Sequence, residues 1–300
     1  ITVPENYVVA ATGNLQTKEE KNWLEKKVKE TENLINSPAK EYPTPESSEN
    51  LKTIRYTEDN IHDFAWFADK DYLVLKDTAT LLNSGREVGC WAFFREENVE
   101  QWKKAPGYIK DALHYYSKWY GDYPYENCTA ILNPPGARGG GMEYPTITAI
   151  GRSGNDFFLE VVIMHEVGHN WFYGILAFNE REHPWMDEGI NTFSEIRYMQ
   201  EKYKDTNIIS LAIGDFAETW LGIKNMEYKN YHKTSYLMSA RNHSDQPATL
   251  HSVEFKPMNY GTVVYSKTGM AFYMLMNYLG EEKFNKIMRD FYEEWKYKHP

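Results

Sequence analysis

Two histidines four residues apart, with a glutamate directly after the first, lie in the stretch VVIMHEVGHNWFYG, Val161 to Gly174. Asn155 or Asp156 just before it can cap a helix, so we expect one helix to run from there to about Gly174. Positions i and i+4 share one face of a helix, and His165 and His169 can therefore direct their ring nitrogens at one metal ion. Two ligands do not hold zinc, so this pattern requires a second element, packed against the helix, that supplies a third.

The third ligand is expected in the segment WMDEGINTF, at the start of the next predicted helix. Glu188 follows His169 after 18 intervening residues, a length that lets the chain end one helix, turn and return along it. His165, His169 and Glu188 leave a fourth position for water, which is the catalytic form of a zinc site. Glu166 is predicted to point toward that position and to act as the general base. Glu195, two turns after Glu188, is predicted to hydrogen-bond a ligand histidine from outside the ligand set.

The alternative is a helix that carries these histidines without binding a metal. The HExxH pattern arises by chance in some chains, but a glutamate at the matching distance on a following helix makes the metal site the better interpretation. The other histidines have no ligand-like spacing and are predicted to be surface residues or satisfied core residues. They are His62, His114, His183, His232, His243, His251 and His299.

Strand-like segments precede helical ones along the chain, and this order predicts an α+β fold. Residues 1–15 alternate apolar and polar side chains and then reach a turn, which is typical of a strand. The Lys- and Glu-rich segment from Thr17 to about Asn36 is either a solvated helix or a flexible insertion, and Ser37 to Asn50 has the composition of a linker. Further strands are expected at 53–56, 72–75, 89–94, 129–132 and 144–151, and further helices at 97–121, from about 186 onward and at 268–300, with breaks near Pro106 and Gly280.

Composition and charge limit the class of protein. With 42% hydrophobic and 15% aromatic residues, the 300-residue chain is folded rather than disordered. The net charge of −10 argues against nucleic acid and anionic membranes as partners. No apolar run approaches the length of a membrane span. Cys90 and Cys128 do not make a disulfide framework and leave the compartment open. The chain is expected to be soluble, and its start at Ile1 rather than Met is typical of an excised fragment.

A second motif upstream adds to a resemblance to a known family. HEVGH with Glu188 after 18 residues resembles the gluzincin aminopeptidases, which include alanyl aminopeptidase and leukotriene hydrolase. That family carries a GxMEN motif before the zinc helix, and GGGMEYP stands at the corresponding place here. A glycine-rich strand edge lets a peptide backbone approach and pair with it. The resemblance implies that Gly140, Gly141 and Met142 bind substrate there. It also implies that Glu143 binds the free α-amine of the substrate.

A third motif, VVYSKTG, is similar to the tyrosine motif of the family, Y-x-K-G. The resemblance implies that Tyr265 donates its hydroxyl to the oxyanion that forms on the scissile carbonyl. Two positions depart from the family: Tyr144 stands where the family has Asn, and Thr268 occupies the glycine position of the tyrosine motif, with Gly269 after it. Neither departure removes a predicted ligand, base or amine anchor. Activity is therefore expected, while the alignment of the substrate backbone and the specificity are left open.

The resemblance implies a thermolysin-like zincin domain, with a small mixed sheet, a mainly helical second half and an active-site cleft between them. Residues 1–15 would be the end of an N-terminal β domain and 16–300 the catalytic domain, in which 16–50 form a charged helix or linker insertion. The C-terminal helical domain of the family is expected to be absent from this chain. Both neighbouring domains wall the site in the family, so a fragment without them can be weakly active or inactive even with zinc bound.

The predicted function is the zinc-dependent removal of N-terminal residues from peptides with free N-termini, with one zinc ion per chain. A thermolysin-like endopeptidase shares the zinc motif but does not need Glu143, and it would cleave N-acetylated peptides as well. An inactive, zinc-bound binding or scaffold domain is a further possibility. An epoxide hydrolase activity, found in one family member, has no specific support in the sequence. Oligomeric state, compartment and the preferred first residue stay open.

Overall fold

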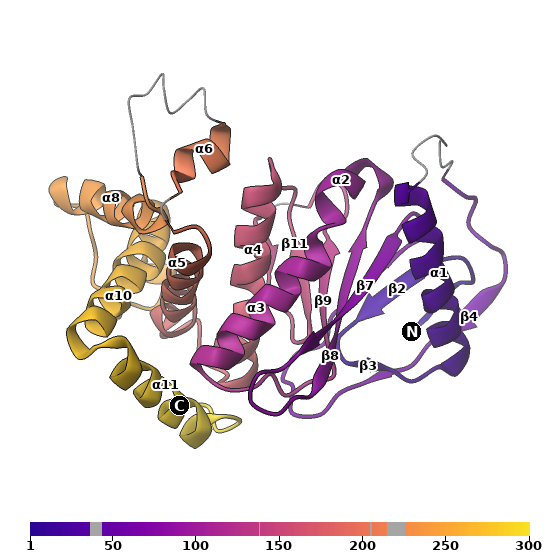
Figure 1. Ribbon diagram of the computed structural model, residues 1–300, viewed down its shortest axis with the longest axis horizontal. Helices are drawn as coiled ribbons and strands as arrows, with labels where there is room; N and C mark the ends of the chain where they lie inside the picture. Colours follow the sequence, from indigo (N-terminus) through magenta and orange to yellow (C-terminus); the bar gives the residue numbers. More distant parts are fainter. Residues whose placement is uncertain (37–43, 138, 205, 215–225) are drawn as a thin grey trace. The chain divides into compact units, whose positions relative to one another are not determined.

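The computed structural model describes residues 1–36, 44–137, 139–204, 206–214 and 226–300 (Figure 1). The chain forms two compact units. The first consists of residues 1–118 and 122–170, and the second of residues 119–121 and 171–300. Strands lie in the first unit, and the described part of the second is helical, so the predicted α+β class is confirmed.

A five-stranded mixed sheet organises the first unit, in the order β10-β11-β9-β8-β7. The long strands β7 (Leu73–Thr80) and β8 (Glu87–Phe94) are antiparallel, and β8 pairs in parallel with β9 (Asn127–Leu132). Strand β11 (Ile147–Ile150) is parallel to β9, and the short β10 (Gly141–Met142) runs antiparallel to β11 at the end of the sheet. The GGGMEYP motif therefore lies at a sheet edge, as predicted.

Helices cover both faces of this sheet because its strands alternate apolar side chains toward each face. On one face α1 (Lys18–Asn36) packs Leu24 and Val28 against a core that includes Val74 and Phe93. The other face is covered by α3 (Ala105–Trp119) and α4 (Asp156–His169), and α4 contacts β11 (Figure 1). Helix α4 carries the HEVGH motif, so the predicted ligands His165 and His169 belong to the helix layer on the face opposite α1.

The first residues of the chain form three short strands, each antiparallel to a later one. The pairs are β1 (Thr2–Pro4) with β4 (Leu51–Thr53), β2 (Val8–Ala11) with β6 (Trp66–Asp69), and β3 (Asn14–Leu15) with β5 (Tyr56–Thr57). Of the two alternatives for the charged segment, the helix is right, since it is α1. The predicted linker lies partly outside the described residues, at 37–43, and residues 44–50 contain no helix or strand. The assignment of residues 1–15 to a separate β domain stays a prediction.

The second unit is built around α5 (Ile190–Lys202), which follows directly from the π-helix η3 (Trp185–Gly189). Helix α10 packs on α5, and Phe193 lies 5.2 Å between ring centroids from Phe284 of α11. The predicted break at Gly280 is confirmed, with φ of 84° between α10 and α11. Helices α10 and α11 span Thr268–Leu279 and Glu281–Trp295. The other helices of the described residues are η1 (Glu96–Asn98), α2 (Val99–Trp102), η2 (Asn170–Ile175), α6 (Ile208–Ile213), α8 (Tyr228–Arg241), η4 (Ser252–Glu254), α9 (Pro257–Asn259) and η5 (Tyr260–Lys267). Across the described ranges, no helix is long and apolar enough to cross a membrane.

Candidate active site

The HEVGH motif lies on the last turns of α4, as its spacing predicts. The helix begins at its cap, where the Asn155 side chain accepts a hydrogen bond from the Phe158 N–H at 3.1 Å. His165 and His169 lie on one face of the helix with ring centroids 4.7 Å apart. His169 is buried and His165 is half-buried. Two imidazoles at this separation can both reach one ion, which is the first requirement of the predicted metal site.

Glu166, the predicted base, is buried against the edge strand β10. A Cβ atom placed on Gly141 would overlap the Glu166 carboxylate, so only glycine leaves room for this side chain. The backbone beside it is fixed by pairing of Gly141 with Ile150 and by a 2.7 Å hydrogen bond from the Gly151 N–H to the Gly140 carbonyl. The edge strand and the predicted base are thus in direct contact, which the sequence motifs alone do not reveal.

The side chains that follow Gly141 are directed to different faces of the sheet. Met142 and Tyr144 pack against the core on the α1 face, and Tyr144 lies 6.3 Å between ring centroids from Phe67. Glu143 is buried and offers a carboxylate oxygen within 4.8 Å of a ring nitrogen of His169. The departure at Tyr144 therefore places its side chain in the α1-side core, on the face of the sheet opposite α4.

Glu188 and Tyr265 are joined by a direct hydrogen bond within the second unit. Glu188 lies in η3 and is buried, and the Tyr265 hydroxyl, from η5, donates a hydrogen bond to its carboxylate. Gly189 next to it makes room for Thr268, because a Cβ there would overlap the Thr268 methyl group. The Thr268 hydroxyl donates to the Val263 carbonyl at 3.1 Å. The departure at Thr268 is thus a packing feature that joins η5 to the segment bearing Glu188.

Glu195 is buried on α5, and two residues of α8 contact it. Its carboxylate accepts a hydrogen bond from the Tyr228 hydroxyl, and Nε2 of His232 lies 3.5 Å from the same oxygen. Burial raises the pKa of Tyr228 well above its usual range, and the nearby Glu195 carboxylate adds to this, so the phenol remains a donor. The predicted bond from Glu195 to a ligand histidine stays a prediction. Tyr228 was not predicted from the sequence, and His232 was predicted only as a surface or satisfied core residue; the i, i+4 spacing of the two was the only signal for this pair.

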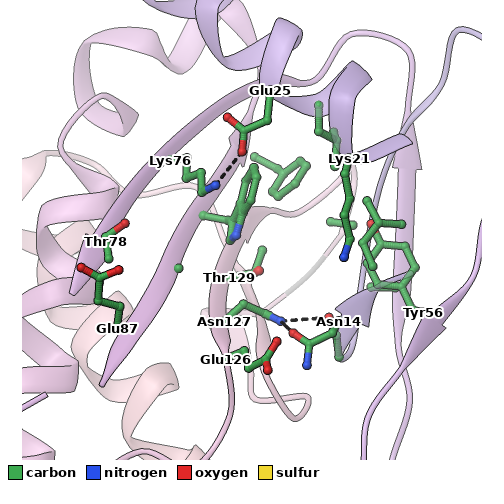
Figure 2. Close-up of a pocket in the computed structure, with 18 residues that line it drawn as sticks. Asn14, Lys21, Glu25, Tyr56, Lys76, Thr78, Glu87, Glu126, Asn127 and Thr129 are labelled. Atoms are coloured by element: carbon green, nitrogen blue, oxygen red, sulfur yellow. Dashed lines mark hydrogen bonds and ion pairs between the residues drawn. The ribbon is translucent and has the colours of Figure 1, made fainter. Parts of the chain in front are cut away.

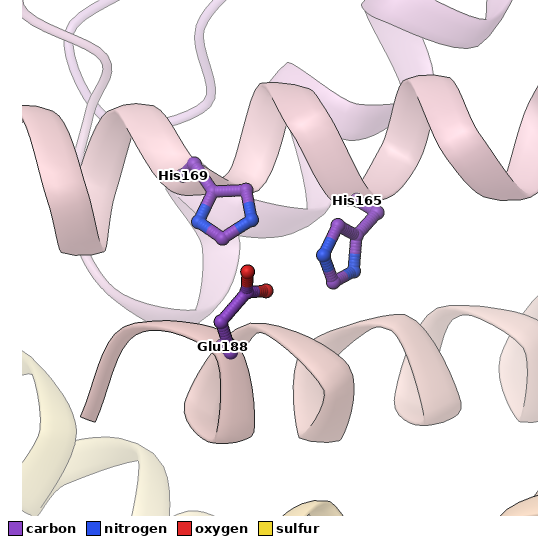
Figure 3. A group of neighbouring side chains, drawn as sticks. All are labelled: His165, His169 and Glu188. Atoms are coloured by element: carbon purple, nitrogen blue, oxygen red, sulfur yellow. The ribbon is translucent and has the colours of Figure 1, made fainter. Parts of the chain in front are cut away.

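Three predicted ligands form one group of neighbouring side chains (Figure 3). His165, His169 and Glu188 each offer one ligand atom, and these atoms lie within 4.8 Å of one another. Two imidazoles and one carboxylate are the donor set of many catalytic zinc sites, so the residues present fit that metal. A second group consists of Glu143, His169 and Asp187. Asp187 is completely buried and was not among the residues predicted for the site.

A separate cavity of about 380 Å³ lies in the first unit, on the face of the sheet that α1 covers (Figure 2). Trp91 of β8 and Asn127 of β9 line it, and Lys76 on its wall pairs with Glu25 of α1 at 2.6 Å. None of the residues predicted for the metal site or the edge strand lines this cavity. It is therefore distinct from the candidate active site.

The fold and the His-His-Glu donor set are typical of zincin-type domains. The model of the peptidase family M1 domain matches residues 107–299, which is most of the chain. The chain belongs to peptidase family M1. The resemblance read from the three motifs is thereby confirmed at the level of the family.

Curated relatives of the chain are named aminopeptidases. Leucine aminopeptidase 2-1 of Meyerozyma guilliermondii is 27% identical over 180 residues, which is 59% of this chain and 27% of that protein. Human aminopeptidase RNPEPL1 is 30% identical over 102 residues, or 33% of this chain and 14% of that protein. The chain thus spans about a quarter or less of the length of these relatives.

Solved structures of the family share the fold. A two-domain M1 zinc metallopeptidase with L-arginine bound is 16% identical, with a TM-score of 0.64 over 98% of this chain and 55% of that one. The M1 zinc metallopeptidase of Deinococcus radiodurans gives a TM-score of 0.59 at 16% identity, covering 100% of this chain and 56% of that one. The chain therefore spans little more than half of these structures.

Proposed function

We propose that this chain carries the catalytic centre of a zinc aminopeptidase that removes N-terminal residues from peptides. The observation that carries the proposal is the group of His165, His169 and Glu188. Glu166 lies on the same helix as the two histidines, and its carboxylate packs against Gly141 of the edge strand. The two relatives named above are both called aminopeptidases, which supports the same activity. Zinc is the metal that this donor set fits best, and we expect one zinc ion per chain.

The metal would be held by His165, His169 and Glu188. When bound, zinc supplies Lewis acidity that polarises the scissile carbonyl and activates water. Glu166 accepts the proton that the attacking water loses and passes it to the leaving amine. Its position against Gly141 keeps that carboxylate close to any peptide paired with the edge of β10. The Gly140 carbonyl already accepts a hydrogen bond from the Gly151 N–H within the sheet. Backbone groups of successive strand residues alternate between the two edges, so Gly141, between Gly140 and Met142, presents its backbone groups to the same peptide.

Substrate selection is assigned to Glu143. A buried carboxylate is costly unless a cation or donor accompanies it, so Glu143 favours a ligand with a positive charge. The free α-ammonium group of a peptide supplies that charge, whereas an acetylated N-terminus does not. This difference separates an aminopeptidase from an endopeptidase that uses the same metal and base.

The test of the function compares free and N-acetylated aminoacyl p-nitroanilides on protein of known zinc content. Only the free substrates are expected to be cleaved, and Glu143→Ala is expected to weaken that cleavage while the zinc content stays at one equivalent. Equal cleavage of acetylated substrates would instead identify a thermolysin-like endopeptidase. One equivalent of zinc with no turnover of either substrate would identify a binding domain or an incomplete site, and the same assay on a longer chain would distinguish the two.

Tyr265→Phe is expected to lower kcat by about 10²–10³-fold, because the variant removes a donor aimed at the developing oxyanion. The Tyr265 hydroxyl donates to the Glu188 carboxylate in this structure, and a metal on Glu188 would compete for that oxygen and release the hydroxyl to substrate. Zinc content and KM are expected to change little. Tyr260→Phe is the matched control, since its ring lies 5.9 Å from that of Tyr265 in the same π-helix. An equal loss in both variants would contradict a specific role for Tyr265.

A further inference from the structure

His232 lies buried at the centre of a hydrogen-bonded cluster in the second unit. Its Nδ1 atom is 3.2 Å from the Ser266 hydroxyl, and its Nε2 atom is 3.5 Å from the Glu195 carboxylate. The rings of Tyr228 and Tyr231 pack edge-on against it, with centroids at 5.3 and 5.0 Å. Only 6% of the residue is exposed. His232 is thus a core residue, as predicted, but only its Nδ1 atom has a hydrogen-bond partner, and Nε2 faces the Glu195 carboxylate at 3.5 Å without a hydrogen bond.

Both polar partners of His232 belong to segments that carry candidate catalytic groups. Ser266 directly follows Tyr265 in η5. Glu195 lies two turns after Glu188 in the helix formed by η3 and α5. Helix α8, which bears His232, packs against both α5 and η5. His232 therefore bridges the segment of the proposed oxyanion donor to the helix of a proposed metal ligand.

The carboxylate beside Nε2 favours one direction for the hydrogen bond at Nδ1. A carboxylate near Nε2 favours the imidazole tautomer with its proton on that nitrogen. Nδ1 is then an acceptor, so the Ser266 hydroxyl donates to it. The Tyr228 hydroxyl, which donates to the same Glu195 carboxylate, holds that acceptor in place. The result is an ordered chain of contacts from α5 through His232 to the residue beside Tyr265.

We propose that His232 is a positioning residue that, through Ser266, holds the Tyr265 hydroxyl where it can act on the substrate oxyanion. The inference rests on the proposed function, since it assigns His232 to the same reaction. An oxyanion donor is effective only when its direction is set before the reaction, and a displacement of about 1 Å can cost on the order of 10²-fold in rate. Tyr265 is half-buried in a π-helix, so a contact from α8 adds a constraint that its own segment lacks.

The decisive experiment is a double-mutant cycle between His232 and Tyr265. His232→Phe keeps a buried ring and removes both nitrogens, and Ser266→Ala removes only the hydroxyl. Each is expected to lower kcat by about 10–100-fold with zinc content and KM nearly unchanged. In a Tyr265→Phe background, neither change is expected to lower kcat by more than about 2-fold, because the group they position is already absent.

A structural role would give a different result. If His232 only stabilises the fold, its substitution lowers kcat by the same factor in the wild-type and Tyr265→Phe backgrounds, and the proposal is wrong. Ser239→Ala is the matched control: it removes a 3.0 Å hydrogen bond from α8 to Asn259, the residue before η5, that involves neither His232 nor Ser266. We expect this control to lower Tm at most. If His232→Phe does not fold, Ser266→Ala decides the question alone.

A second measurement does not require turnover. In zinc-free protein labelled with ¹³C at the tyrosine ζ position, the Tyr265 signal is identified by its loss in Tyr265→Phe. His232→Phe and Ser266→Ala are expected to shift that signal toward the position of an unbonded phenol, whereas Ser239→Ala leaves it in place. An unmoved signal overturns the inference. If the two variants shift the signal but the wild-type protein has no aminopeptidase activity, only the proposed function is overturned.

Discussion

Glu166→Gln is expected to retain zinc and fold but to lose about 10²–10⁴-fold in kcat. The amide has nearly the same shape as the carboxylate, so it fits the same space beside Gly141. It cannot accept the proton that the attacking water must lose, and it cannot return a proton to the leaving amine. The measurement is steady-state hydrolysis of a free aminoacyl p-nitroanilide, with zinc determined on the same sample.

Glu160→Gln provides the matched control for this prediction. Glu160 is also a buried glutamate of α4, with 2% of its surface exposed, but it has no place in the candidate site. We expect this variant to keep its kcat within about 2-fold, since changes away from the reacting groups act mainly on stability. Retention of full activity by Glu166→Gln would show that another group is the base. Loss of zinc from it would show that the residue supports the metal instead.

Gly141→Ala is the second large expected effect, of about 10²-fold or more in kcat. The new methyl group would overlap the Glu166 carboxylate, which lies at the end of a flexible side chain and therefore moves aside. A base displaced by about 1 Å from its working position loses on the order of 10²-fold in rate. Stability is expected to change little, because the clash is relieved by one side chain rather than by the sheet. Thermal unfolding and kcat measured together test both halves of this expectation.

Two comparisons make the Gly141 result interpretable. Gly154→Ala adds a methyl group that meets no atom within 4 Å, and it is expected to leave kcat unchanged. In a Glu166→Gln background, Gly141→Ala is expected to have little further effect on kcat, because the base is already lost. A full and independent loss in that background would mean that Gly141 acts through the peptide paired with β10 rather than through Glu166.

Local regularity made much of this protein predictable. The four-residue spacing of His165 and His169 defines one helix face whatever surrounds the helix, and the structure has both on α4. The strands predicted at 89–94 and 129–132 appear as β8 and β9, each longer by two residues at its start. The charged segment before residue 37 was undecided because composition does not distinguish a solvated helix from an insertion, and Leu24 and Val28 decide it by packing on the sheet.

Other features depend on contacts between distant segments, which no local pattern encodes. The edge position of β10 follows from the strand order β10-β11-β9-β8-β7, which is not the order of the sequence. Thr268 looked like a defect in a motif, and the fold shows that its methyl group fills the space left by Gly189. Tyr144 looked like a change near the substrate, and pleating of the chain turns its side chain to the α1 face.

The sequence by itself determined the donor types and the helix that presents His165 and His169, because side-chain chemistry and helical periodicity are local properties. Only the tertiary structure decided which groups act together. Gly141 meets Glu166, and the Tyr265 hydroxyl meets Glu188 across 77 residues of sequence, because packing of separate elements brings them into contact. The same packing placed His232 between Glu195 and Ser266, where spacing alone gave it no role.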